Sequence, residues 1–593
     1  MSRRISYYPL NGGLDYTTAP LFVDPGRALF IKNYACDLNG GYRQLGQYER
    51  FDGRTAPSSS SDPAQQEIYR ALITAVPGSG PVRGVAYFNG TVYAWRDNAG
   101  GTATVMHKST AGGWVAITAA SYIPFNLGNT STAIVEGNTI GNAAVPTKTA
   151  VVVRVVYYGV WDATTTATGR LYVTSVVGAW AAADPIYVGA TQRATATGGV
   201  TTQTIAPAGQ YETIQFNFYG ASDKFRLYGV DGVNPAFDFD GTYLCHYTTG
   251  MTIDKPTHIA QNHNYLWLTF AGGSLQNSAV GDPSGFSPRL GSAEISLGED
   301  VTNLVAQKDT LVCYGRNSVF VLYGNDSSSF QLKSFTRQGG GISRTAQYIG
   351  SEVLALDDSG LLFLQAVQAY GDFNAATVSD QVRPVFDRQT PSFTIMQRSN
   401  GRYILFWDDK TALVCTLAGT KVLGYGNAGY AHQFVCGWSG EDTGGDDRSF
   451  VGADNGFVYE LDKGDSQDGA DIESILRIPF NALGGPQSRK RWHKLRLEII
   501  SPSSVTIRIA PEFDYGLSSG LVQDADFIGG GGYWDSVAWD EFTWDGGASS
   551  SSTIYLDGVS PNIGFVIYHN DKATPFTLVA VGLSWTPRSQ DRD

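Results

Sequence analysis

The stretch YFNGTVYAW (residues 87–95) joins two apolar, aromatic-rich runs through an Asn-Gly pair, which is a strong local signal for a β-hairpin. An Asn or Asp turn followed by a strand with an aromatic or aliphatic pair recurs along the chain. The further copies are FDFDGTYLCHY (237–247), YGRNSVFVLYG (314–324), ALDDSGLLFLQ (355–365), WDDKTALVCTL (407–417) and VGADNGFVYELD (451–462). From Asn317 onward the turn residues lie 41, 51 and 46 residues apart, which is the period of a four-stranded propeller blade.

The earlier gaps in this repeat indicate an insertion. Between Asp240 and Asn317 an extra turn and strand, NHNYLWLTF (262–270), fills the longer gap. Between Asn89 and Asp240 there is one blade plus about a hundred further residues. Residues 119–215 hold only eight charged side chains and contain alternating runs such as TAVVVRVVYY (149–158). We therefore expect a separate β-sandwich or small barrel inserted in the propeller.

Composition agrees with an all-β protein rich in tight turns. Charged residues make up 16 % of the chain, aromatic residues 12 %, and glycine accounts for 70 of 593 residues. We expect about six propeller blades, an inserted β-domain, a C-terminal β-domain and very little helix. The expected parts are 1–60 as an N-terminal β segment contacting an adaptor or the propeller, 61–118 as the first propeller part, 119–215 as the insertion, 216–480 as the main propeller and 481–593 as the C-terminal β-domain.

Three local patterns give more specific expectations. Asp24-Pro25 predicts a short helix over 27–34, because proline is favoured at the first helical position. Asp62-Pro63 is a second helix start, although 68–76 fits a strand equally well. GYGNAG (424–429) matches GxGxxG, but no helix follows it, so we interpret it as a glycine-rich turn.

Net charge and cysteine content restrict the partners. The net charge of −13 disfavours a surface that clamps DNA or anionic membranes as a whole. The five cysteines include no CxxC pair, which indicates a reducing assembly compartment without disulfides. The N-terminus has no apolar signal region and no run reaches the length of a membrane span, so we expect no membrane segment.

Few residues in the sequence have the pattern of a catalytic or metal-binding site. His258 and His263 form the only close histidine pair, and their odd spacing on a strand would point them to opposite faces. No HExxH, GxSxG or P-loop sequence is present, and the acidic run DKGDSQDGAD (462–471) lacks EF-hand spacing, so we interpret it as a solvated loop. We expect no catalytic residues, no metal site and no cofactor.

An acidic region near the C-terminus is the sharpest charge signal. Between Glu512 and Asp557 there are acidic residues but no Lys or Arg, and Trp-Asp recurs every five residues within 533–547. The candidates for acids that face a channel are Glu512, Asp514, Asp524, Asp526, Asp535, Asp540, Glu541 and Asp545. The alternative is an acidic surface loop with packed tryptophans.

A basic cluster precedes this region. It contains Arg489, Lys490, Arg491, Lys494 and Arg496, on a strand whose alternate residues are apolar. Because the strand has one charged face, we expect contact with an acidic neighbour or another copy of the chain rather than DNA binding.

The N-terminal stretch 11–53 resembles the opening of tail nozzle proteins of short-tailed bacteriophages, also called tail tubular protein B. The matching residues are Gly12-Gly13-Leu14, Pro25-Gly26, Asn33 and Gly40-Gly41-Tyr42-Arg43. The segment IPFNALGGPQSRKRWHKLRLEI (478–499) and the Trp-Asp repeat add to the resemblance, which covers most of the chain except 119–215.

The resemblance implies a structural virion protein of the phage tail, assembled in the host cytoplasm. It implies a homohexameric ring below the portal and its adaptor ring, beside other tail proteins such as fibres. Double-stranded DNA would pass through the ring without specific binding, and part of the ring would retain the genome until infection. Two other hypotheses remain: a receptor- or glycan-binding tail adhesin whose insertion carries the binding surface, and a propeller hydrolase.

Overall fold

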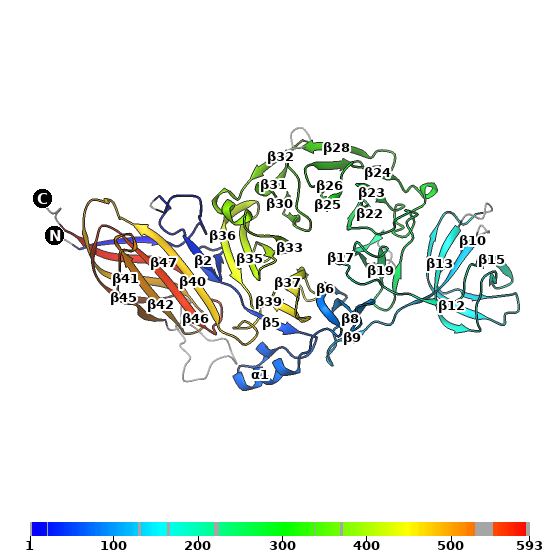
Figure 1. The fold of residues 1–593 in the computed structure, drawn as a ribbon, viewed down its shortest axis with the longest axis horizontal. Coiled ribbons are helices and arrows are strands. Elements are labelled where there is room, and N and C mark those ends of the chain that lie inside the picture. The colour runs from blue at the N-terminus through cyan, green and yellow to red at the C-terminus, as the bar shows by residue number, and fades with distance from the viewer. Residues whose placement is uncertain are drawn as a thin grey trace. The chain divides into compact units, whose positions relative to one another are not determined.

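The protein is an all-β molecule, as the composition predicted. The computed structural model describes residues 3–20, 22–128, 132–162, 167–218, 225–336, 339–350, 352–367, 372–527 and 549–588. Within these ranges antiparallel sheets dominate, and the α-helices are α1 (Pro63–Leu72) and α2 (Arg383–Phe386) (Figure 1). The chain divides into unit 1, residues 1–74, 111–113 and 358–593, and unit 2, residues 75–110 and 114–357.

Unit 2 contains four propeller-type sheets, each of four antiparallel strands in sequence order. The first has β6 (Ser79–Phe88), β7 (Thr91–Asp97), β8 (Thr104–Lys108) and β9 (Val115–Ala116). The second has β17 (Glu212–Asn217), β18 (Phe225–Val230), β19 (Phe237–Phe239) and β20 (Leu244–His246). The third has β21 (His258–Asn262), β22 (Tyr265–Phe270), β23 (Ser274–Asn277) and β24 (Glu294–Ser296). The fourth has β25 (Val301–Gln307), β26 (Thr310–Gly315), β27 (Val319–Tyr323) and β28 (Gln331–Thr336). A further hairpin pairs β29 (Gln347–Ile349) with β30 (Glu352–Asp357).

The insertion forms a sheet that closes on itself. Its strands are β10 (Ser121–Gly128), β11 (Thr139–Gly141), β12 (Thr149–Tyr158), β13 (Ala167–Val177), β14 (Pro185–Val188), β15 (Thr191–Ala196) and β16 (Thr201–Thr202). The order β13-β12-β11-β14-β15-β10 returns to β13 through a β10–β13 pairing. Phe125, Trp161 and Trp180 contribute to a core of its own inside this closed sheet.

Unit 1 contains two more propeller-type sets. The first is β33 (Pro391–Gln397), β34 (Arg402–Trp407), β35 (Thr411–Ala418) and β36 (Lys421–Gly429). The second combines β37 (Phe434–Glu441), β38 (Asp447–Ala453) and β39 (Val458–Leu461) with the N-terminal strand β5 (Tyr48–Phe51). A hairpin of β31 (Gly360–Val367) and β32 (Asp372–Thr377) precedes them. Each of these six four-stranded sets lies within one unit, and the strand order adds a seventh, β29-β30-β31-β32, so the described residues hold one set more than the six blades expected from the repeat.

The C-terminal β-domain belongs to unit 1 and has two sheets. One continues from β36 through β3 (Tyr34–Cys36) and β4 (Tyr42–Gln44) to β47 (Thr577–Pro587), β41 (Lys490–Ile500) and β45 (Ser549–Ser560), with β1 (Arg4–Pro9) also paired to β47. The other contains β2 (Phe30–Lys32), β40 (Ile472–Asn481), β46 (Ile563–Asp571), β42 (Val505–Phe513), β43 (Ser518–Ser519) and β44 (Gln523–Phe527). The N-terminal strands thus join a propeller-type set to the C-terminal domain.

The repeat in the sequence has a structural origin. Asn317, Asp409 and Asn455 each lie between the second and third strands of their set. Asn89 and Gly90 have positive φ angles of 48° and 79° between β6 and β7, as a tight two-residue hairpin turn requires. Because the turns at Asn317, Asp409 and Asn455 are equivalent, their spacing reports the length of the repeating unit, whereas the turn at Asn89 joins a first strand to a second and Asp240 follows a third strand.

Two local expectations were wrong and one alternative was decided. Residues 27–34 form β2 and isolated bridges instead of a helix, because Phe30–Lys32 pairs with β40. GYGNAG lies inside β36 rather than in a turn, between β35 and β3. The helix alternative holds at 63–72, where the Asp62 side chain caps α1 by accepting from the Ala64 amide at 3.0 Å.

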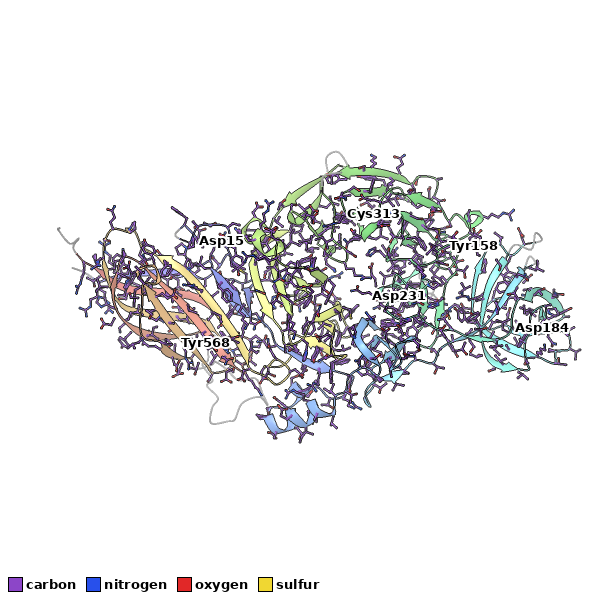
Figure 2. All side chains as sticks on the ribbon, viewed as in Figure 1. Asp15, Tyr158, Asp184, Asp231, Cys313 and Tyr568 are labelled. Atoms are coloured by element: carbon purple, nitrogen blue, oxygen red, sulfur yellow. The ribbon has the colours of Figure 1, made fainter. Side chains whose placement is uncertain are left out.

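Buried polar residues hold segments outside the sheets, among them the one loop predicted from the sequence to be solvated. Asp468 of the acidic run 462–471 has an 8 % exposed side chain and binds Arg50 at 2.6 Å, so this loop is not simply solvated. Asp15, which is labelled in Figure 2, accepts a hydrogen bond from the Thr18 amide at 2.9 Å in the N-terminal segment. All five cysteines are buried and none forms a disulfide, including Cys313 on β26 (Figure 2).

Candidate functional site

The outer face of the sheet β1–β47–β41–β45 gathers basic and apolar side chains. Along β41, Trp492, Leu495 and Leu497 are buried, whereas Arg491 and Arg496 are exposed. Since residues opposite each other on paired strands share a face, the pairing register gives the layout of this surface. The predicted single charged face of the strand is therefore present.

Two rows of residues paired across neighbouring strands run over β1, β47, β41 and β45. In the first row Ile5 lies opposite Ser584, Ser584 opposite Lys494, and Lys494 opposite Tyr555. In the second row the neighbours are Tyr7, Gly582, Arg496 and Thr553. We call this surface the basic face and define it by Arg3, Ile5, Tyr7, Arg491, Lys494, Arg496 and Tyr555.

Side chains of the basic face are held by contacts within the chain. Arg3 donates to the Ser584 hydroxyl, and Arg496 donates to the Ser551 hydroxyl at 2.8 Å. The Lys494 ammonium lies 4.7 Å from the centre of the Tyr555 ring, a cation–π contact. These contacts fix the cations in place before any partner arrives.

The charges around His493 show that distant segments converge here. Burial lowers the pKa of His493, and the nearby Arg3 and Arg491 cations lower it further. The amide of Arg588 donates to the carbonyl oxygen of Arg489 at 2.8 Å at the same end of the sheet. Sequence reasoning found residues 489–496 but missed Arg3, because its place depends on the pairing of β1 with β47.

Lys490 differs from the rest of the predicted basic cluster. Its side chain is buried, and its ammonium donates to the carbonyl oxygens of Gly485, Ser488 and Pro561 at 2.8–3.0 Å. Burial lowers its pKa. Lys490 therefore fastens a loop within the domain, and Arg491, Lys494 and Arg496 carry the surface charge of β41.

The acids predicted to face a channel are distributed over the second sheet. Glu512 binds Arg477 at 2.9 Å, and Asp524 binds Arg508 at 2.9 Å. Asp526 accepts from the Thr506 hydroxyl at 2.8 Å, and Asp514 begins a short 3-10 turn. Asp535, Asp540, Glu541 and Asp545, with the Trp-Asp repeat, lie outside the described residues.

Large apolar side chains accompany these acids. Leu517 and Leu521 are each 83 % exposed, and Val522 is also largely exposed. We call residues 514–526 the acidic edge, defined by Asp514, Leu517, Leu521, Val522, Asp524 and Asp526. A groove of about 460 Å³ adjoins it and is lined by Phe22, Phe480, Leu483, Tyr515 and Asn562, among others. Apolar exposure of this kind is typical of an interaction surface.

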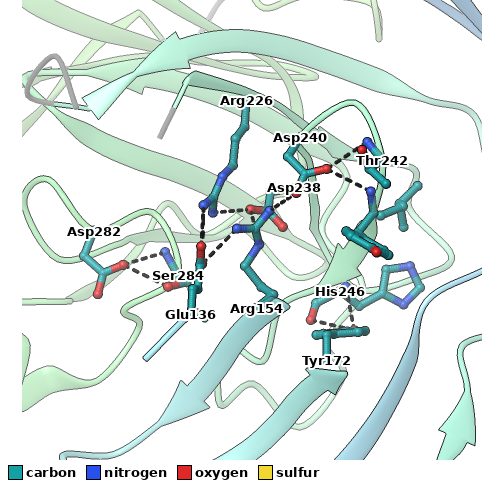
Figure 3. Close-up of polar contacts among 12 residues, drawn as sticks. Glu136, Arg154, Tyr172, Arg226, Asp238, Asp240, Thr242, His246, Asp282 and Ser284 are labelled. Carbon is teal, nitrogen blue, oxygen red and sulfur yellow. Dashed lines mark hydrogen bonds and ion pairs between the residues drawn. The ribbon is translucent and has the colours of Figure 1, made fainter. Parts of the chain in front are cut away.

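A second polar cluster joins the insertion to a propeller-type sheet in unit 2. Asp238 on β19, which is fully buried, lies 2.7 Å from Arg226 on β18 and 3.2 Å from Arg154 on β12 (Figure 3). Glu136 bridges both arginines, and Asp240 binds Arg154 at 2.9 Å. Burial disfavours the charged guanidinium of Arg154, but Asp238 and Glu136 outweigh it and raise its pKa.

Apolar contacts reinforce this junction. Val156 and Tyr172 of the insertion pack in one cluster with Phe218 and Tyr228 of the adjacent sheet. The Tyr172 hydroxyl also accepts from the His246 amide at 2.8 Å. The insertion is thus fixed to its neighbouring sheet by a buried ionic and apolar contact.

Clusters of metal-ligating side chains and helices able to span a membrane are both absent from the described residues. No group of three or more His, Cys, Asp or Glu side chains within the described ranges is arranged to hold a metal ion. His258 is paired with Glu212 at 2.9 Å, and His263 lies in the turn after β21. No helix in the part of the chain described here is both long and apolar enough to cross a membrane.

Comparisons with known proteins give only distant likenesses. No protein-family model matches the chain, and no curated protein matches it significantly. Among solved structures, it is similar to the computationally designed Ika8 protein at 10 % identity, with a TM-score of 0.31 and coverage of 66 % of this chain and 98 % of that chain. It is also similar to BBS1N, crystallised with ARL6DN and soaked with lead, at 9 % identity, with a TM-score of 0.31 and coverage of 58 % and 98 %. Likenesses this weak carry no argument about function.

Proposed function

We propose that this chain is a structural protein of a phage tail, a nozzle subunit that continues the DNA conduit and helps to retain and release the genome. In this proposal it acts without catalysis or a cofactor. It assembles as a homohexameric ring against an adaptor ring, beside fibres, in the virion.

The observation that carries the proposal is the role of the N-terminal residues on which the nozzle resemblance rests. Gly12, Gly13, Gly26, Gly40 and Gly41 all have positive φ angles between 71° and 102°, and Asn33 has a φ of 56°. These are left-handed conformations that favour glycine and asparagine. The glycines and the asparagine of the resemblance therefore occupy positions that the backbone geometry restricts.

The same residues hold the junction between sheets. The Tyr42 hydroxyl donates to the Gly26 carbonyl oxygen at 2.8 Å, and the Asn33 side chain accepts from the Gly429 amide at 2.7 Å. Asn33 also donates to the Glu473 carbonyl oxygen at 2.9 Å. These residues join a propeller-type set to the C-terminal domain. Because their role is structural, they support an assembly subunit more than an enzyme.

The surfaces of the C-terminal domain suit a ring subunit. The basic face and the acidic edge expose aromatic, aliphatic and arginine side chains, a composition typical of protein interfaces. Arg489, Arg491, Lys494 and Arg496 are the proposed contacts to a neighbouring subunit or the adaptor. The acids of 512–545 are proposed to border the DNA path, where like charge would keep DNA from sticking.

Cryo-electron microscopy of the intact particle containing this chain tests the proposal. The expected result is a six-fold ring around an axial hole, with residues 512–545 at the hole. A peripheral position, as part of a fibre or spike, would contradict it.

The second candidate function is a tail adhesin, and the insertion favours it. The insertion has its own closed sheet and core, and it exposes Val145 and Val177 among few charges. Binding of the whole protein to host cells, compared with a variant lacking 119–215, tests this function. Binding that depends on the insertion would favour the adhesin, and equal behaviour of both proteins would count against it.

A further inference from the structure

We propose that the basic face of one copy docks on the acidic edge of a second copy, so that the C-terminal domains form the contact between neighbouring subunits. The inference rests on the proposed ring. It moves Asp514, Asp524 and Asp526 from the proposed border of the DNA path to the contact between subunits, and it leaves the other acids of 512–545 at that border. Both surfaces belong to unit 1 and to a single domain.

Charge complementarity is the first argument. Arg3, Arg491, Lys494 and Arg496 lie on the outer face of one sheet. Glu498 on β41 accepts from Tyr7 at 2.8 Å and pairs with Arg496 at 3.6 Å, so it offsets only part of the charge of the four cations. The acidic edge carries Asp514, Asp524 and Asp526 on the other sheet. Arg508 binds Asp524, so Asp514 and Asp526 carry most of the uncompensated charge on this edge. Opposite potentials of this kind steer partners together and fix their orientation.

Apolar complementarity is the second argument. Ile5, which is 79 % exposed, stands with Tyr7 and Tyr555 among the cations of the basic face. Leu517, Leu521 and Val522 are exposed among the acids of the edge. Phosphate groups would use the arginines but not these isoleucine and tyrosine side chains, whereas a protein partner would bury them. A partner with its own exposed leucines and acids fits the whole basic face.

The placement of the two surfaces decides the kind of assembly. The basic face belongs to the sheet of β41, and the acidic edge belongs to the sheet of β42. Because a copy presents two different surfaces, each contact leaves one of each kind free for the next copy. Such heterologous contacts form a closed ring when the rotation closes and a filament when it does not.

Charge reversal and exchange test the contact. Arg491→Glu with Arg496→Glu should weaken self-association of the full chain at least about tenfold in mass photometry and light scattering. Asp524→Arg with Asp526→Arg should do the same, and the two pairs combined should restore association. Arg289→Glu, at an exposed ion pair in unit 2, is the matched control and should leave assembly unchanged. Unaltered melting curves show that the variants are folded.

Four results would contradict the proposed contact between the basic face and the acidic edge. Reversed variants that assemble like the natural protein exclude the basic face, and a failed rescue excludes its pairing with the acidic edge. A natural protein that does not associate with itself excludes the contact altogether. Salt-sensitive binding of double-stranded DNA, lost in the Arg491/Arg496 variant while assembly persists, would assign the face to phosphates instead. The nozzle proposal itself is decided separately, by the position of the chain in the particle.

Discussion

Gly13 lies against the backbone of Tyr425, so closely that a Cβ atom on Gly13 would fall 2.3 Å from the Tyr425 nitrogen. The next amide, that of Leu14, donates to the Tyr425 carbonyl oxygen at 2.8 Å. Gly424 and Gly426 flank Tyr425 on β36, where added Cβ atoms would approach Cys36 Sγ to 2.6 Å and the Tyr34 carbonyl oxygen to 2.2 Å. The glycines on both segments allow the N-terminal chain to lie directly on β36.

Gly13→Ala should therefore be strongly destabilising. The φ of Gly13 is 71°, which a non-glycine residue adopts at a cost, and the new methyl would clash with backbone that has no rotamer to change. We expect the free energy of unfolding to fall by about 3 kcal/mol or more, measured by urea denaturation.

Gly40→Ala is the matched control. Gly40 also has a positive φ, 94°, but an added Cβ there meets nothing within 4 Å. Its cost should be about 1 kcal/mol, from the backbone conformation alone. Equal losses in the two variants would show that close approach to Tyr425 does not matter.

The local features of the fold could be predicted from the sequence. Asn89-Gly90 determines a hairpin turn by its own conformational preference, and the turns at Asn317, Asp409 and Asn455 repeat with the strand sets. The alternation along 492–500 likewise predicts the buried and exposed faces of β41. In these cases the determining interactions lie within a few residues or one repeat.

Features that depend on distant segments could not be predicted. GYGNAG resembles a turn, but its glycines serve the approach of residues 12–14 and 34–36, about 400 positions away. Instead of the helix expected at 27–34, residues Phe30–Lys32 form a strand that pairs with β40. Arg3 joins the basic face only because β1 pairs with β47, and no local pattern around residue 3 indicates that register.

Asp238→Ala should destabilise the junction of the insertion with its neighbouring sheet. Asp238 is buried and pairs with both Arg154 and Arg226, so its loss leaves two buried cations with Glu136 and Asp240 as their remaining acids. We expect a loss of about 3 kcal/mol in the free energy of unfolding, measured by chemical denaturation.

Asp162→Ala is the control for this experiment. Asp162 pairs with Arg289, whose side chain is 61 % exposed, and such surface pairs contribute about 0–1 kcal/mol. A comparable loss in both variants would contradict the importance of the buried cluster.

Stability should fall on acidification because of His246. Burial, with a smaller effect of Arg170, lowers the pKa of His246 to about 3 from 6.5. Between these values the unfolded chain binds a proton that the folded chain does not, so stability decreases as pH falls and is unaffected by this group above about pH 6.5. The slope from this one group should reach ~1.4 kcal/mol per pH unit.

Melting temperatures of the natural protein and His246→Gln, measured from pH 7 to pH 4.5, check this expectation. The variant should show a shallower loss, although His107 and His569, whose pKa values burial also lowers, add slopes of the same sign. His432→Gln, at a half-exposed position, is the control substitution. Parallel curves for the natural protein and His246→Gln would contradict the role of His246.

The buried thiols make a final prediction about how the molecule opens. Burial raises the pKa of Cys36 and of Cys415 to about 12, and all five thiols are shielded in the folded chain. Because the thiolate is the reactive form and must also be reached, a disulfide reagent at pH 8 should label none of them quickly in the native protein. All five should react in denaturant.

Gly13→Ala should speed the labelling of Cys36 more than that of Cys313 in unit 2, because Cys36 lies where the N-terminal segment meets β36. Mass spectrometry of the labelled peptides measures the labelling rate of each cysteine. Equal acceleration at both cysteines would indicate global unfolding rather than local release of the N-terminal strands.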